Sequence, residues 1–262
     1  MIKYFETHAH YDDRRFNPDR GELLSKLLPE AGVSRVINIG ADIESSKAGI
    51  RLAQKYDYVL ASVGVHPHNV KDVKDSELDV LLEMSRNERV AAFGEIGLDF
   101  YYEHSPRDVQ LRRFRDQLEV AVKTGLPVII HSRDAHAETY AMLEEYAPRL
   151  NGGVIHCFSG GAELALAYAK LGFYIAFGGA LTFPKAVKTV ESAFRLPIEH
   201  IVLETDCPYI APVPIRGKRN DSRSLYHICR KLAEIKGIKH EEAARAVWEN
   251  AEKLFNLKEK QE

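Results

Sequence analysis

The sequence contains only three cysteines, Cys157, Cys207 and Cys229, among 262 residues. They are too few and too widely spaced for a disulfide framework or for a zinc site built from Cys-x-x-Cys motifs. This usage of cysteine is typical of a reducing compartment. Any metal ion that the chain binds must therefore be held by other residues.

The sequence also lacks a long hydrophobic run. Its longest apolar stretch, residues 164–183, is interrupted by Lys170 and by several glycines. No segment therefore reaches the roughly 18 residues that a membrane-spanning helix needs. The first six residues lead directly into acidic and histidine residues, without the apolar segment of a secretory signal. We expect a cytoplasmic protein that does not enter the membrane.

Neither sign of charge predominates. Lysine and arginine total 36 and aspartate and glutamate total 38, a net charge of −2 with neutral histidine. No overall field attracts or repels nucleic acid, so a polyanionic substrate would need a local basic patch. With 45% hydrophobic and 28% charged residues, the composition indicates a globular chain and excludes a disordered one.

Short apolar or β-branched runs alternate with longer amphipathic stretches along the whole chain. No proline-rich linker or change of composition divides it, so we predict a single domain over residues 1–262. Eight β-then-α units favour an α/β fold of the closed (β/α)8 TIM barrel type over an open doubly wound sheet. The predicted strands are Ile2–Thr7, Arg35–Gly40, Tyr58–Val65, Val90–Glu95, Pro127–His131, Gly153–His156, Phe173–Phe177 and His200–Glu204. The predicted helices are Arg20–Ala31, Glu44–Tyr56, Ser76–Arg86, Arg107–Thr124, Arg133–Tyr146, Ala162–Leu171, Pro184–Ala193, Arg223–Ile235 and His240–Phe255.

Polar residues concentrate where the predicted strands end. In a barrel of this kind the carboxyl ends of the strands meet at one rim, which carries the chemistry. Seven of the eleven histidines fall at or just beyond these ends, so residues far apart in the sequence would meet there. The strand ends carry His8 and His10, His66 and His68, Glu95, His131 with His136 shortly after it, His156, and Glu204 with Asp206.

The His8-x-His10 pair is typical of a metal site. Side chains two residues apart in a strand point to the same side, so both imidazoles can reach one ion. Such a pair in isolation is more often two polar residues at a strand exit, but here further histidines accompany it. Glu95 follows an apolar run, where a charge is costly unless it is paired or bound to metal. It either bridges two cations or forms a salt bridge with an arginine in the barrel mouth.

The remaining strand ends complete a set of ligands for two ions. His131 and His156 each follow an apolar run; either one alone would suggest a structural histidine, but together they favour ligands. We assign Asp206 as a ligand that orients the attacking water as general base and Glu204 as its support, with the reverse assignment open. The predicted catalytic residues are thus Asp206, Glu95 and Glu204, and the predicted metal ligands are His8, His10, Glu95, His131, His156 and Asp206.

A binuclear site of this composition predicts hydrolysis. Two cations generate hydroxide at neutral pH and stabilise both the attacking and the leaving oxygen, which suits phosphoesters or amides. Four imidazoles suit zinc, manganese or nickel, because magnesium prefers oxygen ligands and retains its waters. The ligand set therefore predicts the type of reaction and leaves the bond open.

Cationic residues near the same rim could hold phosphate oxygens. The loop after the last strand carries three of them, and another follows His131 by two residues, although a basic loop can also be merely solvated. Aromatic residues near the ligands could stack the bases of a single strand, although rim aromatics more often simply pack. The predicted substrate-binding residues are Arg133, Arg216, Lys218 and Arg219, with His66 and His68 for phosphate contact or proton transfer. The aromatic residues are Phe100, Tyr101, Tyr102, Phe158 and Tyr209.

With these motifs, almost the whole chain resembles the TatD-type metal-dependent deoxyribonucleases, a branch of the amidohydrolase-like barrel hydrolases. The resemblance implies the same six metal ligands, magnesium dependence and trimming of DNA from the 3′ end. The matching segments are Thr7–His10, Gly64–His68, Gly94–Asp99, His131–Arg133, His156–Gly160 and Glu204–Tyr209. Two segments depart from the family pattern and bear on substrate range. Tyr11-Asp12 stands where Leu-Asp is common, and Asn220-Asp221-Ser222 stands where Asn-Glu-Pro is common.

The leading hypothesis is a two-metal phosphodiesterase that cleaves DNA as a 3′-5′ exonuclease. Its cofactors would be two divalent cations, Mg²⁺ by the resemblance or Zn²⁺, Mn²⁺ or Ni²⁺ by the ligand types. Its partner would be DNA, single-stranded or at 3′ ends, with no obligate protein partner. One alternative is a hydrolase of the same fold that acts on an ester or amide, such as a D-aminoacyl-tRNA deacylase. Another is a metal-holding nucleic-acid-binding protein without catalysis, which the complete ligand set disfavours.

Overall fold

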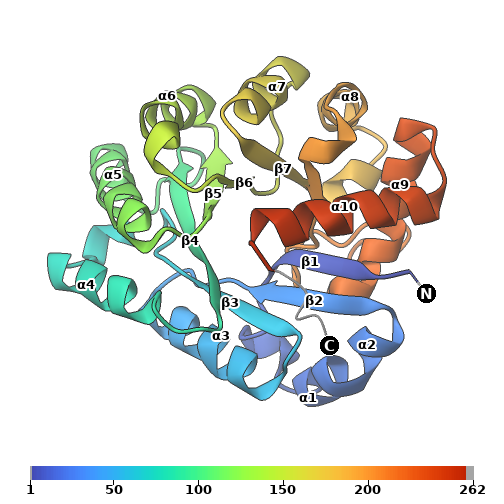
Figure 1. Cartoon of the computed structure of the whole chain (residues 1–262), viewed down its shortest axis with the longest axis horizontal. Helices are drawn as coiled ribbons and strands as arrows, with labels where there is room; N and C mark the ends of the chain where they lie inside the picture. Colours follow the sequence, from blue (N-terminus) through green and yellow to red (C-terminus); the bar gives the residue numbers. More distant parts are fainter. Residues whose placement is uncertain (1, 258–262) are drawn as a thin grey trace.

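The predicted (β/α)8 barrel is confirmed. The structure, a computed structural model, describes residues 2–257, and within them eight parallel strands pair in sequential order. The sheet curves into a barrel with helices around its outside (Figure 1). The strands are β1 (Tyr4–Ala9), β2 (Val33–Asn38), β3 (Val59–Val63), β4 (Val90–Asp99), β5 (Val128–Arg133), β6 (Gly153–Ile155), β7 (Phe173–Phe177) and β8 (Ile201–Leu203).

Helices connect the strands and cover the outer face of the barrel (Figure 1). Among the described residues, no helix is both long and apolar enough to span a bilayer. Local signals end the longer helices: α5 stops at Gly125, which has a φ of 66° that favours glycine. The helices are α1 (Arg20–Glu22), continued by a π-helical turn (Leu23–Leu27) into α2 (Leu28–Glu30), then α3 (Ile43–Lys55), α4 (Asp75–Met84), α5 (Arg107–Thr124), α6 (His136–Tyr146), α7 (Ala162–Lys170), α8 (Val187–Arg195), α9 (Leu225–Lys236) and α10 (His240–Leu254).

The barrel closes between β1 and the segment that follows β8. Ala9 and Cys207 form a parallel bridge. The amide of His10 donates to the carbonyl of Cys207 at 2.8 Å, and the amide of Asp206 donates to the carbonyl of His8 at 3.0 Å. This closure places Asp206 directly beside the two histidines of β1.

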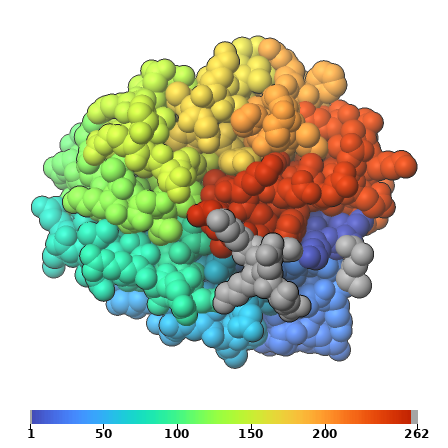
Figure 2. Space-filling model, viewed as in Figure 1, coloured from blue at the N-terminus to red at the C-terminus, as the bar shows by residue number. Residues whose placement is uncertain are grey.

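Two apolar cores surround the sheet. An outer core fills the space between the strands and the helices. An inner core fills the barrel, and α10 closes its amino end (Figures 1 and 2). There Phe255, just past the end of α10, stacks on Phe5 of β1 with ring centroids 5.5 Å apart. The inner core comprises Phe5, Ile37, Ile39, Leu60, Ala91, Ala92, Ile129, Val154, Ala176 and Val202, with Ala251 and Leu254 of α10 and Phe255 just past its end.

Side chains two residues apart in a strand point to the same side, so the polar residues that follow the inner core point into the barrel at its carboxyl end. Ile129 of β5 belongs to the inner core, and His131 lies two residues further on the same side. The same step leads from Val154 to His156 and from Val202 to Glu204. Strand periodicity therefore directs these polar side chains into the mouth.

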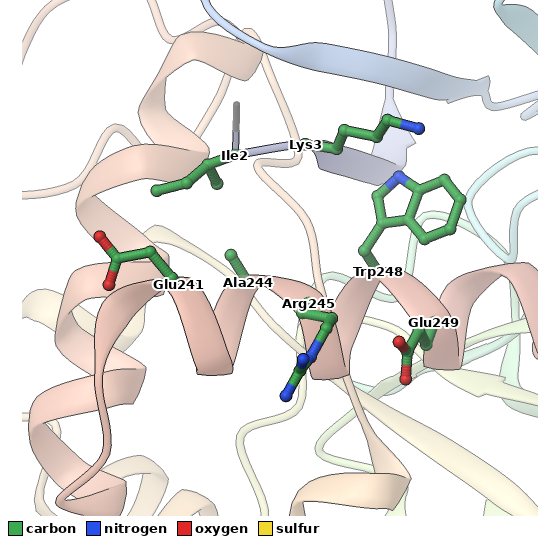
Figure 3. Close-up of a pocket in the computed structure, with 7 residues that line it drawn as sticks. All are labelled: Ile2, Lys3, Glu241, Ala244, Arg245, Trp248 and Glu249. Atoms are coloured by element: carbon green, nitrogen blue, oxygen red, sulfur yellow. The ribbon is translucent and has the colours of Figure 1, made fainter.

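A separate hollow of about 490 Å³ lies near the amino end of β1. Ile2 and Lys3 face the side chains of α10 across it (Figure 3). Trp248 forms part of its wall and donates an indole hydrogen bond to Ser34 Oγ at 2.9 Å. This hollow is remote from the carboxyl-end mouth.

Many element boundaries differ from the sequence prediction by a few residues, and two of these differences bear on the site. β4 continues to Asp99, four residues beyond the predicted end, and Arg133 ends β5 whereas the prediction made it the first residue of a helix. Gly94 and Gly97 of β4 allow close approach to β5. A Cβ at Gly97 would lie 2.0 Å from the carbonyl oxygen of His131, and one at Gly94 would lie 2.5 Å from that of Ile129.

Candidate metal centre

Side chains from β1 and from the segment after β8 meet on one side of the mouth. Nε2 of His8 lies 3.5 Å from Oε2 of Glu95 and 3.8 Å from Oδ1 of Asp206. Nε2 of His10 lies 3.5 Å from the same Asp206 oxygen. Asp206 has a φ of 53°, an unfavourable conformation for a residue with a side chain and one that recurs at functional sites. The predicted group of two histidines and Asp206 is thus brought together.

Three further histidines approach the other oxygen of Glu95. Its Oε1 lies 2.8 Å from Nδ1 of His131, 3.4 Å from Nε2 of His156 and 3.5 Å from Nε2 of His66. His131 and His156 were predicted as ligands. His66 was predicted to contact substrate, but its ring lies as near to Glu95 as those of the predicted ligands.

The donor atoms fit a divalent cation pair. Within residues 2–257, one group of mutually close donors comprises His8, His10 and Glu95, and another comprises His66, Glu95 and His131. Glu95 belongs to both, as a bridging carboxylate would. Both ring nitrogens of His8 are buried, and neither has a hydrogen-bond partner among the described residues. A buried imidazole without partners is costly unless a ligand satisfies it.

Electrostatics hold Glu95 ionised despite its burial. Burial alone would raise the pKa of Glu95, but His66, His156 and His8 outweigh it and hold the pKa well below its usual value. Burial lowers the pKa of His66, which leaves its ring neutral and able to donate a lone pair. Against the opposing effect of burial, Glu204 and Glu95 raise the pKa of His156 to about 10. A cation would have to displace that proton in order to bind His156.

Glu204 lies behind His156, away from the open cavity. Its Oε1 accepts the amide hydrogen of Cys157 at 2.7 Å and lies 3.1 Å from Nδ1 of His156. Glu204 is 1% exposed. This geometry positions the His156 ring, as an outer carboxylate does in many metal sites.

Asp99 is a buried carboxylate that the sequence prediction did not single out. Its Oδ2 lies 2.7 Å from Nε2 of His68 and 3.3 Å from Nε2 of His131. Burial would raise its pKa, but His131, the Tyr102 amide and His68 together lower it. Its position in the sequence could have revealed it. Asp99 is four residues after Glu95, so the two side chains lie on the same side of the strand once β4 is extended to Asp99.

Glu6 is a second buried carboxylate that the prediction missed. Its Oε1 accepts the amide hydrogens of Thr205 at 2.8 Å and of His8 at 3.1 Å. Burial raises the pKa of Glu6 to about 8. Glu6 thus links β1 to the end of β8 beneath the histidines.

The side chains open into a cavity of about 520 Å³. Its walls include His10, His66, His68, Glu95, His131, Arg133, His156 and Asp206, together with Tyr102 and Tyr209. The cavity therefore reaches both halves of the carboxylate and histidine cluster. A substrate that enters it meets Arg133, Tyr102 and Tyr209 near the ligands.

The other predicted basic residues lie elsewhere. In the part of the chain that the structure describes, Arg133 lines the cavity, whereas Arg216, Lys218 and Arg219 do not. Arg219 forms a two-pronged pair with Asp19 at 2.7 and 2.5 Å. The structure thus brings one of the four predicted cations to the cavity.

Comparison with known families agrees with this geometry. Residues 5–256 match the family described as TatD related DNase. The chain is 36% identical to an uncharacterized metal-dependent hydrolase, YabD, of Bacillus subtilis, over 97% of this chain and 99% of that protein. It is 32% identical to a 3'-5' ssDNA/RNA exonuclease TatD of Dickeya dadantii, over 96% of this chain and 97% of that one.

A solved structure shares the fold closely. The chain superimposes on YjjV, a TatD homologue from Escherichia coli K12, with a TM-score of 0.91 and 31% identity. The match covers 98% of this chain and 99% of that one. The fold of almost the whole chain is therefore shared with this solved TatD homologue.

Proposed function

The chain belongs to the TatD-related DNase family, and we propose that it is a metal-dependent phosphodiesterase that trims single-stranded DNA from its 3′ end. That the chain is a metal-dependent hydrolase follows from its family and from its relatives. The observation that carries the proposal is Glu95, whose two oxygens face two separate groups of imidazole nitrogens in an open cavity.

The predicted ligands are the residues that would hold the cations. His8, His10 and Asp206 would serve one ion, His131 and His156 the other, and Glu95 both. Two divalent cations, when bound, lower the pKa of a water molecule and neutralise charge on a phosphate. Imidazole nitrogens favour zinc, manganese or nickel, and Mg²⁺ remains the family's expectation.

The chain's own residues supply the base and its orientation. Against the effect of burial, the hydrogen bond from His10 and the charges of His156 and His8 lower the pKa of Asp206. Its carboxylate is therefore ionised at neutral pH and can accept the proton of the attacking water. Glu204 fixes the ring of His156, and Asp99 lies against those of His131 and His68.

A phosphate group suits the remaining lining of the cavity. Arg133 is exposed and lines it, and among residues 2–257 no carboxylate forms an ion pair with it. An unpaired guanidinium offers the planar set of donors that phosphate oxygens accept. His66 and His68 also line the cavity, which keeps them as proposed substrate contacts. Cleavage from the 3′ end is supported by the similarity to the 3'-5' ssDNA/RNA exonuclease TatD of Dickeya dadantii.

The test uses metal-stripped protein and single-stranded DNA labelled at the 3′ or the 5′ end. Mg²⁺, Mn²⁺ or Zn²⁺ is added back, and the Asp206→Asn variant is assayed in parallel. We expect metal-dependent release of nucleotides from the 3′ end and loss of turnover in Asp206→Asn. Circular dichroism checks that the variant is folded.

Other outcomes separate the alternatives. A protein that binds two metal ions but cleaves no DNA would overturn the phosphodiesterase proposal. A panel of carboxylic esters, amides and D-aminoacyl-tRNA would then identify a deacylase or amidase. Oligonucleotide binding that no metal converts into cleavage would instead indicate a binding protein.

A further inference from the structure

Exposed tyrosines flank the candidate metal centre on two sides. Tyr101, Tyr102 and Tyr209 are 58%, 49% and 46% exposed, although large aromatic side chains are usually buried. Tyr102 and Tyr209 line the cavity that contains the ligands. An arginine guanidinium lies over the ring of each of these two tyrosines, Arg133 over Tyr102 and Arg15 over Tyr209. We call each of these tyrosines, with the residues that contact it, a platform. Exposed aromatic rings at the rim of a polar cavity are available to a ligand.

The first platform follows β4. The guanidinium of Arg133 lies 4.3 Å from the ring centroid of Tyr101 and 4.6 Å from that of Tyr102. The rings of Tyr102 and His104 are parallel to within 7°, with centroids 5.5 Å apart. His68, which contacts Asp99, meets the Tyr102 ring edge-on at 5.5 Å. These contacts hold Tyr102 in place and leave it 49% exposed.

The second platform follows β8. The guanidinium of Arg15 lies 4.2 Å from the ring centroid of Tyr209. Asp13 fixes that guanidinium by two hydrogen bonds, at 2.9 and 2.7 Å. Tyr209 also contacts the ring of His10 in a T-shaped arrangement, with ring centroids 6.2 Å apart. Tyr209 is thus anchored beside a predicted metal ligand and still exposed.

The two platforms lie on opposite sides of the mouth. The sheet runs from β1 to β8 in order and closes on itself, so β4 and β8 are half a turn apart around the barrel. Glu95 of β4 and Asp206 after β8 lie between the platforms, within the same cavity. A chain laid across the mouth from Tyr102 to Tyr209 therefore passes over the metal ligands.

We propose that Tyr102 and Tyr209 are specificity-determining residues that stack the bases of the two nucleotides flanking the scissile phosphate, one on each side of the metal centre. This inference rests on the proposed nuclease function and adds the residues that select a single strand. Every base has a π face, so stacking on tyrosine is insensitive to sequence. A paired duplex keeps its bases stacked on one another and cannot offer them to both rings. The chain would thus prefer single strands and ends without reading sequence.

The test couples each tyrosine to a base. We would measure kcat/KM for an oligothymidine and for matched oligomers that lack the base on one side or the other of the scissile phosphate. Removal of a stacked base should lower kcat/KM on the order of 10-fold. Removal of the tyrosine that stacks it, in Tyr102→Leu or Tyr209→Leu, should have an effect of the same size. In the matching variant, removal of the same base should have little further effect. Tyr226→Leu is the control, because Tyr226 is 43% exposed and also lies near an arginine, Arg230, but is on α9.

Fluorescence gives a second readout that does not depend on turnover. An oligonucleotide with 2-aminopurine at either flanking position should be quenched on binding to the wild-type protein, and the matching leucine variant should relieve the quenching. Normal cleavage with an unchanged response to base removal in both variants would overturn the stacking inference alone. Failure of the wild-type protein to cleave any oligonucleotide would instead overturn the proposed function.

Discussion

The two mouths of the barrel are built from the same strands but have opposite chemistry. At the carboxyl end, His8, Glu95 and Glu204 are no more than 3% exposed, although each is polar or charged. At the amino end, Phe5 and Phe255 are each 4% exposed and stack on one another. Burial of polar groups without full pairing costs stability, whereas burial of apolar surface supplies it.

This difference separates the part of the barrel that supports the fold from the part suited to chemistry. The inner core and the end of α10 form one continuous apolar cluster. Beyond it the same strands present imidazoles and carboxylates that a cation can satisfy. Changes at one mouth should therefore affect stability, and changes at the other should affect turnover.

The largest effect is expected from Glu95→Gln. Glutamine keeps the size of the side chain but removes the charge that faces both groups of ligands. We expect turnover of single-stranded DNA to fall by on the order of 1,000-fold or more, as for loss of a group that stabilises developing charge. Circular dichroism should show an intact fold. The matched control is Glu83→Gln on exposed α4, which should keep full activity.

Phe255→Ala tests the opposite mouth. Loss of the buried ring from the end of the inner core should lower the free energy of unfolding by about 3–5 kcal/mol, measured by urea denaturation. Turnover at 25 °C should stay within about twofold, because the ring is remote from the ligands. Phe194→Ala is the control: Phe194 is 66% exposed, and its loss should change stability by less than about 0.5 kcal/mol. A proportionate fall in activity with Phe255→Ala would show that the two mouths are not separable.

Metal binding should stabilise the fold and release protons. At 100 times the dissociation constant, a cation that binds only the folded state adds about 2.7 kcal/mol to the free energy of unfolding. The pKa of His156 is raised to about 10 without metal, so at pH 7.5 a cation must displace its proton. Affinity should therefore fall as the pH is lowered. Calorimetry in two buffers with different ionisation enthalpies measures the released protons, and their absence would contradict the ligand assignment of His156.

The smallest effect is expected from Arg219→Ala. Arg219 was predicted to bind substrate, but its guanidinium is paired with Asp19 away from the cavity. We expect kcat/KM to change by less than about twofold and stability by less than about 1 kcal/mol, as for other partly exposed ion pairs. Arg133→Ala should lower kcat/KM more, because Arg133 lines the cavity. Equal effects of the two variants would restore the predicted role of the basic loop.

Much of the fold and the meeting of the predicted ligands were accessible from the sequence because they depend on local rules. Strand periodicity relates Ile129 to His131 and Val154 to His156, and a parallel barrel gathers strand ends at one rim. These two rules suffice to bring residues nearly 200 positions apart, such as His8 and Asp206, into one cluster. Their roles as ligands remain proposals that the experiments above test.

Other features depend on contacts that no local pattern encodes. The glycines of β4 let that strand approach the backbone of His131 and Ile129, a contact between strands that the sequence around them does not reveal. The predicted strand ended at Glu95, so Asp99 at the true end of β4 lay outside it. The pairing of Arg219 with Asp19 could not be predicted either, because Asp19 lies 200 residues earlier in the chain.

The closure of the amino mouth by α10 has a consequence for biosynthesis. Every proposed metal ligand lies between His8 and Asp206, whereas the helix that seals the barrel interior begins at His240. At about 5–20 residues per second, the ribosome adds Phe255 several seconds after Asp206. During that interval the nascent barrel lacks its seal and exposes apolar strand residues, the kind of surface that chaperones bind. Translational pausing before residue 240 would therefore lengthen the period in which the chain is most prone to aggregate.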